Sequence, residues 1–303
     1  MLNRVKNAWE YGLATDCGPV RQVNEDQAFL RIFTDPNADQ LMLVMVADGM
    51  GGYQGGEVAS RMVIDQINRW FTNNIDRIFS STHPFLTLRI ELNKLLIELN
   101  QEVIDYGKRN GKQLGTTLSL LLLYKGRSLL AHVGDSRIYQ LEHVTKCSNY
   151  LQTERIYQAD EETEALEGET TLRQLTEDHT WVNRQVREGK LSRQAARTHP
   201  KRNVLVQCLG IENHLDPFFA ENSYQVGDFF LLCSDGFHEL FSDESILTLV
   251  EHYQNNQHDL QTFTEELIRV ANQTGATDNI TLVIIKPVAT KVKRKKRMVR
   301  LFL

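Results

Sequence analysis

Five short stretches of the sequence place acidic residues at, or just beside, the end of an apolar run. They are NED at 24–26, VADGMGG at 46–52, VGDSR at 133–137, CSDGF at 233–237 and ATDNITLVII at 276–285. A buried carboxylate is costly unless a cation or hydrogen-bond donors neutralise it. One such aspartate is usually a turn former. Five in the same context predict a ligand site at one edge of the folded core.

The residue types at these positions favour a hard metal ion. The nine histidines are dispersed, with no HxH or HExxH spacing. Oxygen ligands alone select Mg²⁺ or Mn²⁺ over zinc. Two such ions close together activate a water and stabilise an in-line displacement at phosphorus. The expected chemistry is therefore hydrolytic.

The composition is that of an ordinary folded protein of 303 residues. Its net charge of −5 argues against bulk nucleic-acid binding. Four isolated cysteines, without a CxxC pair, indicate a reducing compartment. The N-terminus has no signal-peptide core, and no run approaches the roughly 18 apolar residues of a membrane span. We therefore expect a soluble, cytoplasmic protein.

Apolar runs and helical periodicity predict the elements that must position the acids. Strand-like runs lie at 41–47, 117–124, 128–133, 137–141, 229–233 and 280–285. Helical patterns lie at about 56–72, 85–108, 243–253 after Ser242, and 259–273 before Gly275. A turn at Lys125 and Gly126 predicts a hairpin and hence antiparallel pairing. Paired helices with antiparallel strands favour an α+β layered sandwich over a doubly wound parallel sheet.

Eight motifs, in order and at similar spacing, resemble the metal-dependent (PPM, type 2C) protein serine/threonine phosphatases, especially their bacterial branch. The motifs are VRQVNED, VADGMGG, LGTTLSLLLL, HVGDSRIYQL, LTEDHT, HPKRNVLVQCLG, LCSDGF and TDNITLVII. The resemblance covers about residues 10–286. It implies a four-layer αββα sandwich, two antiparallel sheets flanked by helices, within a catalytic domain at 1–286. It also implies a binuclear Mg²⁺ or Mn²⁺ centre that binds a water nucleophile.

Carried over by position, the resemblance implies that Asp48 is the carboxylate shared by both ions. Gly49 would offer its backbone carbonyl to the second ion, and a Cβ there would obstruct the approach. Asp235 and Asp278 would complete the ligands of the first ion.

Three further acids have supporting roles in the same resemblance. Glu25 and Asp26 would hold water ligands and orient them. Asp135, together with Asp235, matches a more weakly held third ion. Glu239 is a further candidate there.

Arg21 stands four residues before Glu25, in the position of the family's phosphate-binding arginine. Its forked guanidinium suits two phosphate oxygens at once. Arg137 begins a strand and is interpreted as structural, and His179 is expected to pack or to hydrogen-bond. Some members have a histidine where this chain has Met50, so the proton donor stays open, with a metal-bound water as one candidate.

Three segments each have more than one interpretation. Residues 181–210 resemble a basic flap beside the active site that suits anionic phosphopeptides, or they form a solvated helix pair. The acidic segment 142–171 is a solvated loop or a regulator-binding lid. The basic tail 287–303 contacts anionic membranes weakly, is solvated without a partner, or binds nucleic acid or an acidic protein surface.

The sequence therefore predicts a phosphatase that hydrolyses phosphoserine and phosphothreonine on proteins by direct attack of water. Its expected catalytic residues are Arg21, Asp48, Asp235 and Asp278. A serine/threonine kinase is the expected counterpart, and no specific nucleic acid is expected. The first alternative is a phosphatase of the same fold dedicated to one regulator or to a small phosphorylated molecule. The second is a pseudophosphatase that only binds, which would lack a metal carboxylate.

Overall fold

Two five-stranded sheets lie face to face in the computed structural model, which describes residues 9–37, 39–51, 55–144, 169–256 and 259–288. One sheet has the order β1 (Trp9–Asp16), β12 (Ile280–Pro287), β11 (Phe229–Cys233), β8 (Arg137–Val144), β9 (Glu169–Gln174). The other has the order β10 (Phe218–Ser223), β7 (Arg127–Val133), β6 (Leu118–Tyr124), β3 (Gln40–Ala47), β2 (Gln27–Thr34). All of these neighbours pair antiparallel, as predicted.

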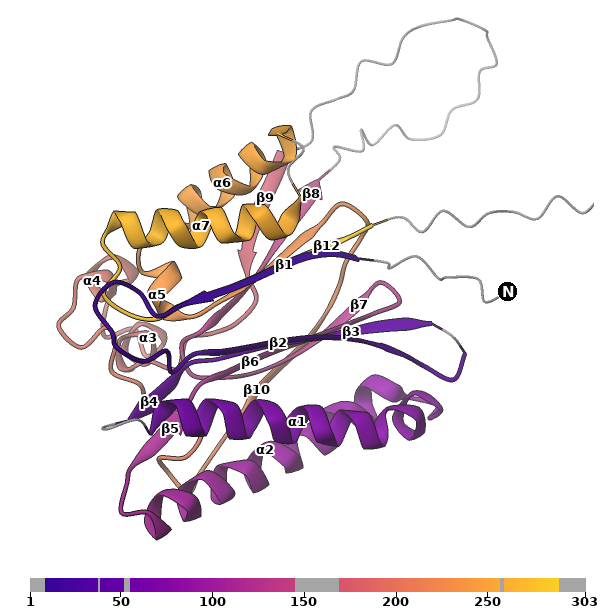
Figure 1. Ribbon diagram of the computed structural model, residues 1–303, viewed down its shortest axis with the longest axis horizontal. Helices are drawn as coiled ribbons and strands as arrows, with labels where there is room; N and C mark the ends of the chain where they lie inside the picture. Colours follow the sequence, from indigo (N-terminus) through magenta and orange to yellow (C-terminus); the bar gives the residue numbers. More distant parts are fainter. Residues whose placement is uncertain (1–8, 38, 52–54, 145–168, 257–258, 289–303) are drawn as a thin grey trace, which may run out of the picture.

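Helices cover the two outer faces of the sheets (Figure 1). The pair α1 (Gly56–Phe79) and α2 (Pro84–Arg109) covers the sheet that contains β3. The pair α6 (Asp243–Asn256) and α7 (Leu260–Thr274) covers the sheet that contains β12. The layers are therefore helix, sheet, sheet, helix, which confirms the αββα sandwich.

One end of the sandwich gathers the shorter elements (Figure 1). They are α3 (Trp181–Arg187), α4 (Arg193–Arg197), α5 (Asp235–His238) and the small sheet of β4 (Gly49–Gly51) with β5 (Leu114–Thr116). The loop from β1 to β2 ends here as well, so this end collects segments that are far apart in the sequence.

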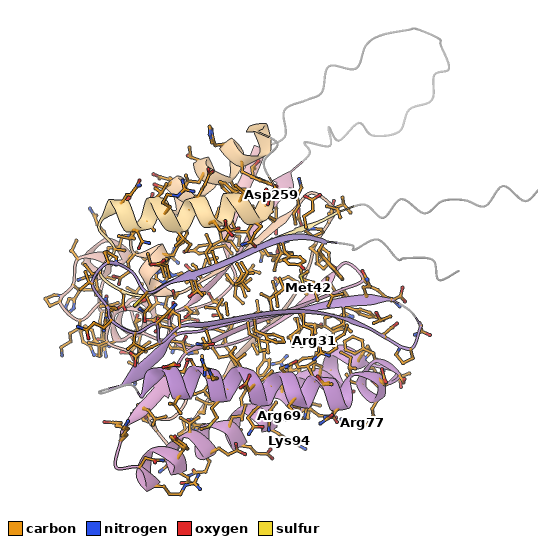
Figure 2. The ribbon with its side chains drawn as sticks, viewed as in Figure 1. Arg31, Met42, Arg69, Arg77, Lys94 and Asp259 are labelled. Atoms are coloured by element: carbon orange, nitrogen blue, oxygen red, sulfur yellow. The ribbon has the colours of Figure 1, made fainter. Side chains whose placement is uncertain are left out.

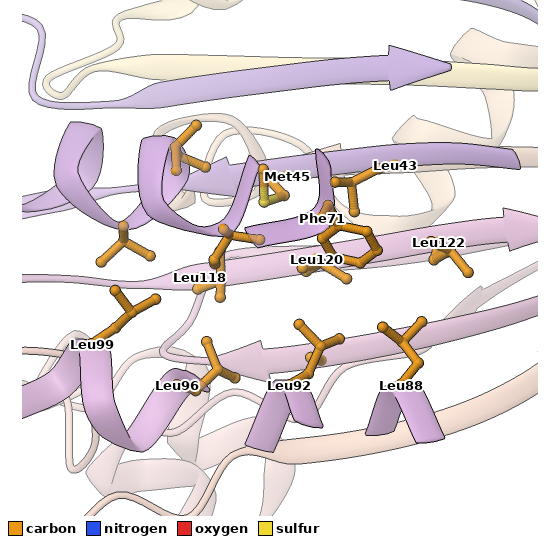
Figure 3. Close-up of a cluster of buried hydrophobic side chains, with 14 of the residues drawn as sticks. Leu43, Met45, Phe71, Leu88, Leu92, Leu96, Leu99, Leu118, Leu120 and Leu122 are labelled. Carbon is orange, nitrogen blue, oxygen red and sulfur yellow. The ribbon is translucent and has the colours of Figure 1, made fainter. Parts of the chain in front are cut away.

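Strand β3 is apolar from Leu41 to Ala47 because both of its faces are buried there. Leu43 and Met45 belong to the cluster under α1 and α2, which also contains Phe71 (Figure 3). Met42 and Val44 belong to the cluster between the two sheets, where Figure 2 shows Met42. A third cluster fills the space under α6 and α7. Three buried clusters separate the four layers.

The hairpin and two helix ends follow the sequence patterns closely. Lys125 and Gly126 have φ of 49° and 74°, the positive values of the tight hairpin turn between β6 and β7. The Ser242 side chain accepts from the Ser245 backbone N–H at the start of α6. Gly275 ends α7 with φ of 103°. These signals are local, which is why they are legible in sequence.

Other boundaries differ from the prediction. Helix α1 continues to Phe79, beyond 72, and strands β1, β2, β9 and β10 were not predicted. These four strands are only partly buried, so their sequences lack a continuous apolar run. The ends of the 142–171 segment also belong to the sheet, because Glu142 and Val144 in β8 pair with Thr171 and Glu169 in β9.

The remainder of that acidic segment, 145–168, and most of the tail, 289–303, lie outside the described residues. Among the helices that the structure describes, none has the length and apolar character needed to cross a membrane.

Candidate active site

Antiparallel pairing brings the acidic motifs to the same end of the sandwich. Ala47 at the end of β3 pairs with Gln27 at the start of β2, so Asp48 lies near Asp26. Cys233 at the end of β11 pairs with Leu282 near the start of β12, so Asp235 lies near Asp278. Strand β7 lies in the same sheet as β2 and β3, and the loop that follows it carries Asp135. The charge of Asp135 also acts on Asp48. The acids of the five motifs therefore lie at the same end of the sandwich, as predicted.

Mutual repulsion marks these carboxylates as one electrostatic cluster. Burial, then Asp26, Asp235 and Asp135, raise the pKa of Asp48 well above its ordinary value. Burial, then Asp278, raise the pKa of Asp235 to about 6. Asp48 and Asp235 also share a hydrogen bond between their side chains. Such a cluster gains free energy when a cation replaces the shared protons.

Two more acids of the cluster lie deeper. Asp26 is 2% exposed, and burial raises its pKa to about 7 although Thr281 and Ser234 hydrogen-bond its carboxylate. Asp135 is 7% exposed, and burial followed by Asp235 and Asp178 raises its pKa. Asp26 and Asp135 each repel Asp235, so the fold holds them close to it against that repulsion.

The clustered side chains are carboxylates, whose oxygens are the ligands that hard divalent cations prefer. No three or more His, Cys, Asp or Glu side chains among the described residues converge on one point closely enough to enclose an ion.

Gly49 has no room for a side chain. A Cβ would lie 2.3 Å from the Gly56 carbonyl oxygen and 2.5 Å from that of Glu25. The Gly49 N–H also donates to the Glu25 carbonyl at 3.2 Å. The close approach that requires glycine is thus between backbone segments, whereas the expected contact of its carbonyl with an ion stays a prediction.

Glu25 and Asp26 join the loop after β1 to other elements. The Glu25 carboxylate accepts from the Gly56 N–H at the first turn of α1, at 3.1 Å. Asp26 accepts from the Ser234 hydroxyl at 2.7 Å, just after β11. One pair of consecutive acids therefore connects the helix over one sheet to a strand of the other.

Arg21 lies on the exposed rim of this cluster. Its guanidinium donates to Asp278 at 2.6 Å, and the side chains are 51% and 38% exposed. Partial burial lowers the pKa of Arg21, but Asp278, Glu25 and Asp48 together hold it above its ordinary value. Arg21, the positively charged side chain predicted for the site, therefore lies next to the carboxylates predicted for it.

Arg137 and His179 have the structural roles expected for them. Arg137 forms an ion pair with Asp178 at 2.7 Å. The His179 Nδ1 accepts from the Gly134 N–H at 3.2 Å, and its ring lies 5.0 Å from that of His132. These three contacts lie next to the loop that carries Asp135.

Several supporting residues were missed although they lie inside the quoted motifs. The Thr117 hydroxyl accepts from the Asp48 N–H at 2.9 Å and lies 2.7 Å from the Ser136 hydroxyl. Asp178, Ser234 and Asn279 also hold site segments in place. Residue type alone gave no signal for them, because each acts through contacts that are distant in sequence.

A sequence model of the family described as protein phosphatase 2C matches residues 20–283. The chain belongs to this family. The serine/threonine phosphatase stp of Listeria welshimeri is 31% identical to this phosphatase 2C chain over 278 residues, covering 90% of this chain and 93% of the relative. The resemblance seen in the motifs is therefore confirmed.

Solved structures of two serine/threonine phosphatases have folds similar to that of this phosphatase 2C chain. The S. agalactiae serine/threonine phosphatase has a TM-score of 0.71 and 27% identity, covering 93% of this chain and 100% of that one. The catalytic domain of the serine/threonine protein phosphatase PstP, solved in complex with two manganese ions, has a TM-score of 0.66 and 26% identity, covering 93% and 99%.

Proposed function

We propose that this chain is a metal-dependent protein serine/threonine phosphatase that hydrolyses phosphoserine and phosphothreonine on proteins. The observation that carries the proposal is the cluster of Asp48, Asp235, Asp26 and Asp135, whose pKa values burial and mutual repulsion raise, with Arg21 on its rim. Family membership and the phosphatase names of the relatives support it.

The proposed cofactors are two Mg²⁺ or Mn²⁺ ions, as the two manganese ions in the PstP structure suggest. Asp48 would bind both ions, with Gly49 through its carbonyl, Asp235 and Asp278 as the other direct ligands. When bound, the ions supply an activated water and stabilise charge on the phosphate.

The remaining acids would hold ordered water and one further ion. Asp26 belongs to the cluster and Glu25 is its neighbour in sequence. Glu25 accepts a hydrogen bond from Gly56 and Asp26 accepts one from Ser234, and these bonds keep the two acids in place. Asp135 would share a weaker third ion with Asp235. Glu239, which is exposed and acts electrostatically on Asp235, is the further candidate there.

Arg21 would bind the phosphate of the substrate. Its guanidinium has five N–H donors in a planar fork, and it is exposed enough to meet a ligand from solvent. It would neutralise phosphate oxygens that the ions do not reach, while the surrounding carboxylates keep it fully charged.

Substrate choice, cellular context and domain limits are proposals as well. The catalytic domain would span 1–286, with β12 ending at Pro287, and the basic flap 181–210 would contact acidic phosphopeptides. A serine/threonine kinase would be the counterpart in the cytoplasm. The basic tail would add weak contact with anionic membranes.

A phosphothreonine peptide tests the proposal directly. Phosphate release should require Mn²⁺ or Mg²⁺, stop on addition of a chelator and return when the ion is restored. Wild-type release in the presence of chelator, or no release by folded, Mn²⁺-loaded protein, would show the proposed function to be wrong.

A further inference from the structure

Asn279 uses both ends of its side-chain amide to hold a loop that is more than 250 positions away. Its Nδ2 donates to the carbonyls of Cys17 at 2.9 Å and Val23 at 3.0 Å. Its Oδ1 accepts from the Glu25 N–H at 2.8 Å. Asn279 is 4% exposed, so these three hydrogen bonds are shielded from competing water.

The loop between Cys17 and Glu25 carries Arg21 at its middle. No helix or strand includes residues 17–26, so the loop has no backbone ladder of its own to fix it. The Cys17 thiol donates to the Arg21 carbonyl at 3.2 Å, which links the held end of the loop to the arginine. The three Asn279 contacts thus restrain the loop on both sides of Arg21.

The anchor itself is fixed next to the acidic cluster. The Asn279 N–H donates to the Asp278 carboxylate at 2.8 Å, and Asn279 directly precedes β12. A Cβ on Gly236, the residue after Asp235, would lie 2.0 Å from the Asn279 carbonyl oxygen. The Asn279 backbone therefore lies against the residues beside two of the acids.

We propose that Asn279 is a positioning residue that sets where Arg21 and Glu25 stand relative to Asp278 and Asp235. This inference rests on the proposed function, because it takes Arg21 to be the phosphate-binding group. Misplacement by about 1 Å costs up to about 100-fold in rate when geometry matters. Asn279 would act on phosphate engagement without touching substrate, alongside the Arg21 contact with Asp278 and the Glu25 contacts with Gly49 and Gly56.

Asn100 offers a matched control. It is 1% exposed, its Nδ2 donates to the Glu212 carbonyl at 2.8 Å, and its Oδ1 accepts from the Gly210 N–H at 2.7 Å. It holds a different loop to α2 in the same two-sided way. Asn100→Ala and Asn279→Ala should therefore lower the melting temperature similarly, whereas only the second releases the loop with Arg21.

Cys17 reports on the loop independently of activity. It is partly exposed, while Cys208 and Cys233 are buried. Alkylation with iodoacetamide, followed by mass spectrometry of the peptide that contains Cys17, should be several-fold faster in Asn279→Ala than in wild type and Asn100→Ala. Asn279→Asp keeps an oxygen that accepts from the Glu25 N–H. It replaces the amide nitrogen that donates to the Cys17 and Val23 carbonyls with a second carboxylate oxygen, which cannot donate. It should speed Cys17 alkylation while the Glu25 amide keeps its protection from hydrogen exchange.

Kinetics on the phosphothreonine peptide with Mn²⁺ provide the second readout. Asn279→Ala should lower kcat/KM on the order of tenfold, and most of that loss should vanish in an Arg21→Ala background. Equal losses in both backgrounds, or wild-type alkylation of Cys17, would overturn the inference. If Arg21→Ala alone leaves kcat/KM unchanged, the phosphate role in the proposed function fails and the catalytic part of this inference fails with it. Cys17 alkylation then still decides whether Asn279 holds the loop.

Discussion

Arg137 and Asp178 form a two-pronged ion pair behind the acidic cluster. The guanidinium donates from Nε to Oδ1 at 3.0 Å and from Nη2 to Oδ2 at 2.7 Å. The side chains are only 23% and 13% exposed, and Tyr139 also accepts from the arginine at 2.9 Å. The pair joins β8 to the segment before α3, close to the loop that carries Asp135.

Removing one partner should be strongly destabilising. Arg137→Ala leaves the Asp178 carboxylate buried without its counter-ion, which costs about 3–5 kcal/mol of unfolding free energy. Urea unfolding measures this loss. The matched control is Arg184→Ala, which breaks an ion pair with Glu188 whose arginine is 60% exposed and should cost less than about 1 kcal/mol. Equal losses in the two variants would contradict the assignment.

The same pair predicts a pH dependence. Burial raises the pKa of Asp178, but attraction to Arg137 outweighs it and holds the pKa below the ordinary 3.8. A lowered folded-state pKa contributes stability that is fully present above 3.8 and is lost as pH falls through the lower value. The stability gap between wild type and Arg137→Ala should therefore be largest near neutral pH and shrink in acid. A gap that widens in acid would reverse the sign argued here.

Asp48→Asn should abolish hydrolysis and leave the fold intact. The change removes the charge that both ions would share. Mutation of residues that only hydrogen-bond to a metal ligand already lowers metal affinity or activity about 10–100-fold. We expect a loss of more than about 100-fold in kcat on phosphothreonine peptide. Because Asp48 repels its neighbours, the variant in chelator should melt no lower than wild type. Retention of a tenth or more of wild-type turnover would show that Asp48 does not bridge.

Metal binding should stabilise the protein more at higher pH. The raised pKa values of Asp235, about 6, and Asp26, about 7, mean that protons compete with ions for the cluster. A raised folded-state pKa gives stability at low pH that is lost as pH rises through 6 to 7 in the ion-free protein. The gain in melting temperature on adding Mn²⁺ should thus be larger at about pH 8 than at about pH 6.

Comparing Mn²⁺-loaded with chelated protein at each pH cancels the titration of distant groups. His132, whose pKa burial lowers to about 3, is one such group common to both forms. Asp48→Asn should show a smaller gain at both pH values. An equal gain at both pH values in wild type would contradict proton competition.

The tail should confer affinity for anionic membranes. Its cations are Lys291, Lys293, Arg294, Lys295, Lys296, Arg297 and Arg300. Each contributes about 1 kcal/mol near an anionic surface. Co-sedimentation with phosphatidylserine vesicles should fall on deletion of 290–303 and on addition of salt, while peptide hydrolysis stays unchanged. Equal sedimentation of the full-length and shortened proteins would remove the membrane proposal and leave the catalytic one.

Much of the fold was predictable where burial is two-sided. Strands β3, β6 and β12 appear in the sequence as apolar runs because neighbouring layers cover both faces. Strands β2 and β10 do not appear as apolar runs, because these edge strands of one sheet are mostly partly buried or exposed. Pattern reasoning detects a strand only when burial forces its composition.

The candidate site was predictable in its acids and not in its supports. Asp48, Asp235 and Asp278 are conspicuous because a carboxylate beside an apolar run demands an explanation. Asn279 looks like an ordinary turn residue until its contacts with Cys17 and Glu25 are seen. Asp178 likewise gains its role from Arg137, 41 positions away. A sequence reveals carboxylates whose burial is energetically unfavourable. It does not reveal the residues that hold them in place, because their types are common and their partners are distant in sequence.

Strands β8 and β9 have a consequence for how this chain can vary. Their last pair, Val144 with Glu169, stands at the opposite end of β8 from Arg137 and the acidic cluster. Val144 and Glu169 are therefore adjacent in the outermost strand pair of the sheet, although 24 positions separate them in the sequence. Lengthening such a connection costs only about 0.6 kcal/mol per doubling. Evolution, or a protein engineer, can graft a new module there while selection on the chemistry proceeds separately at the other end.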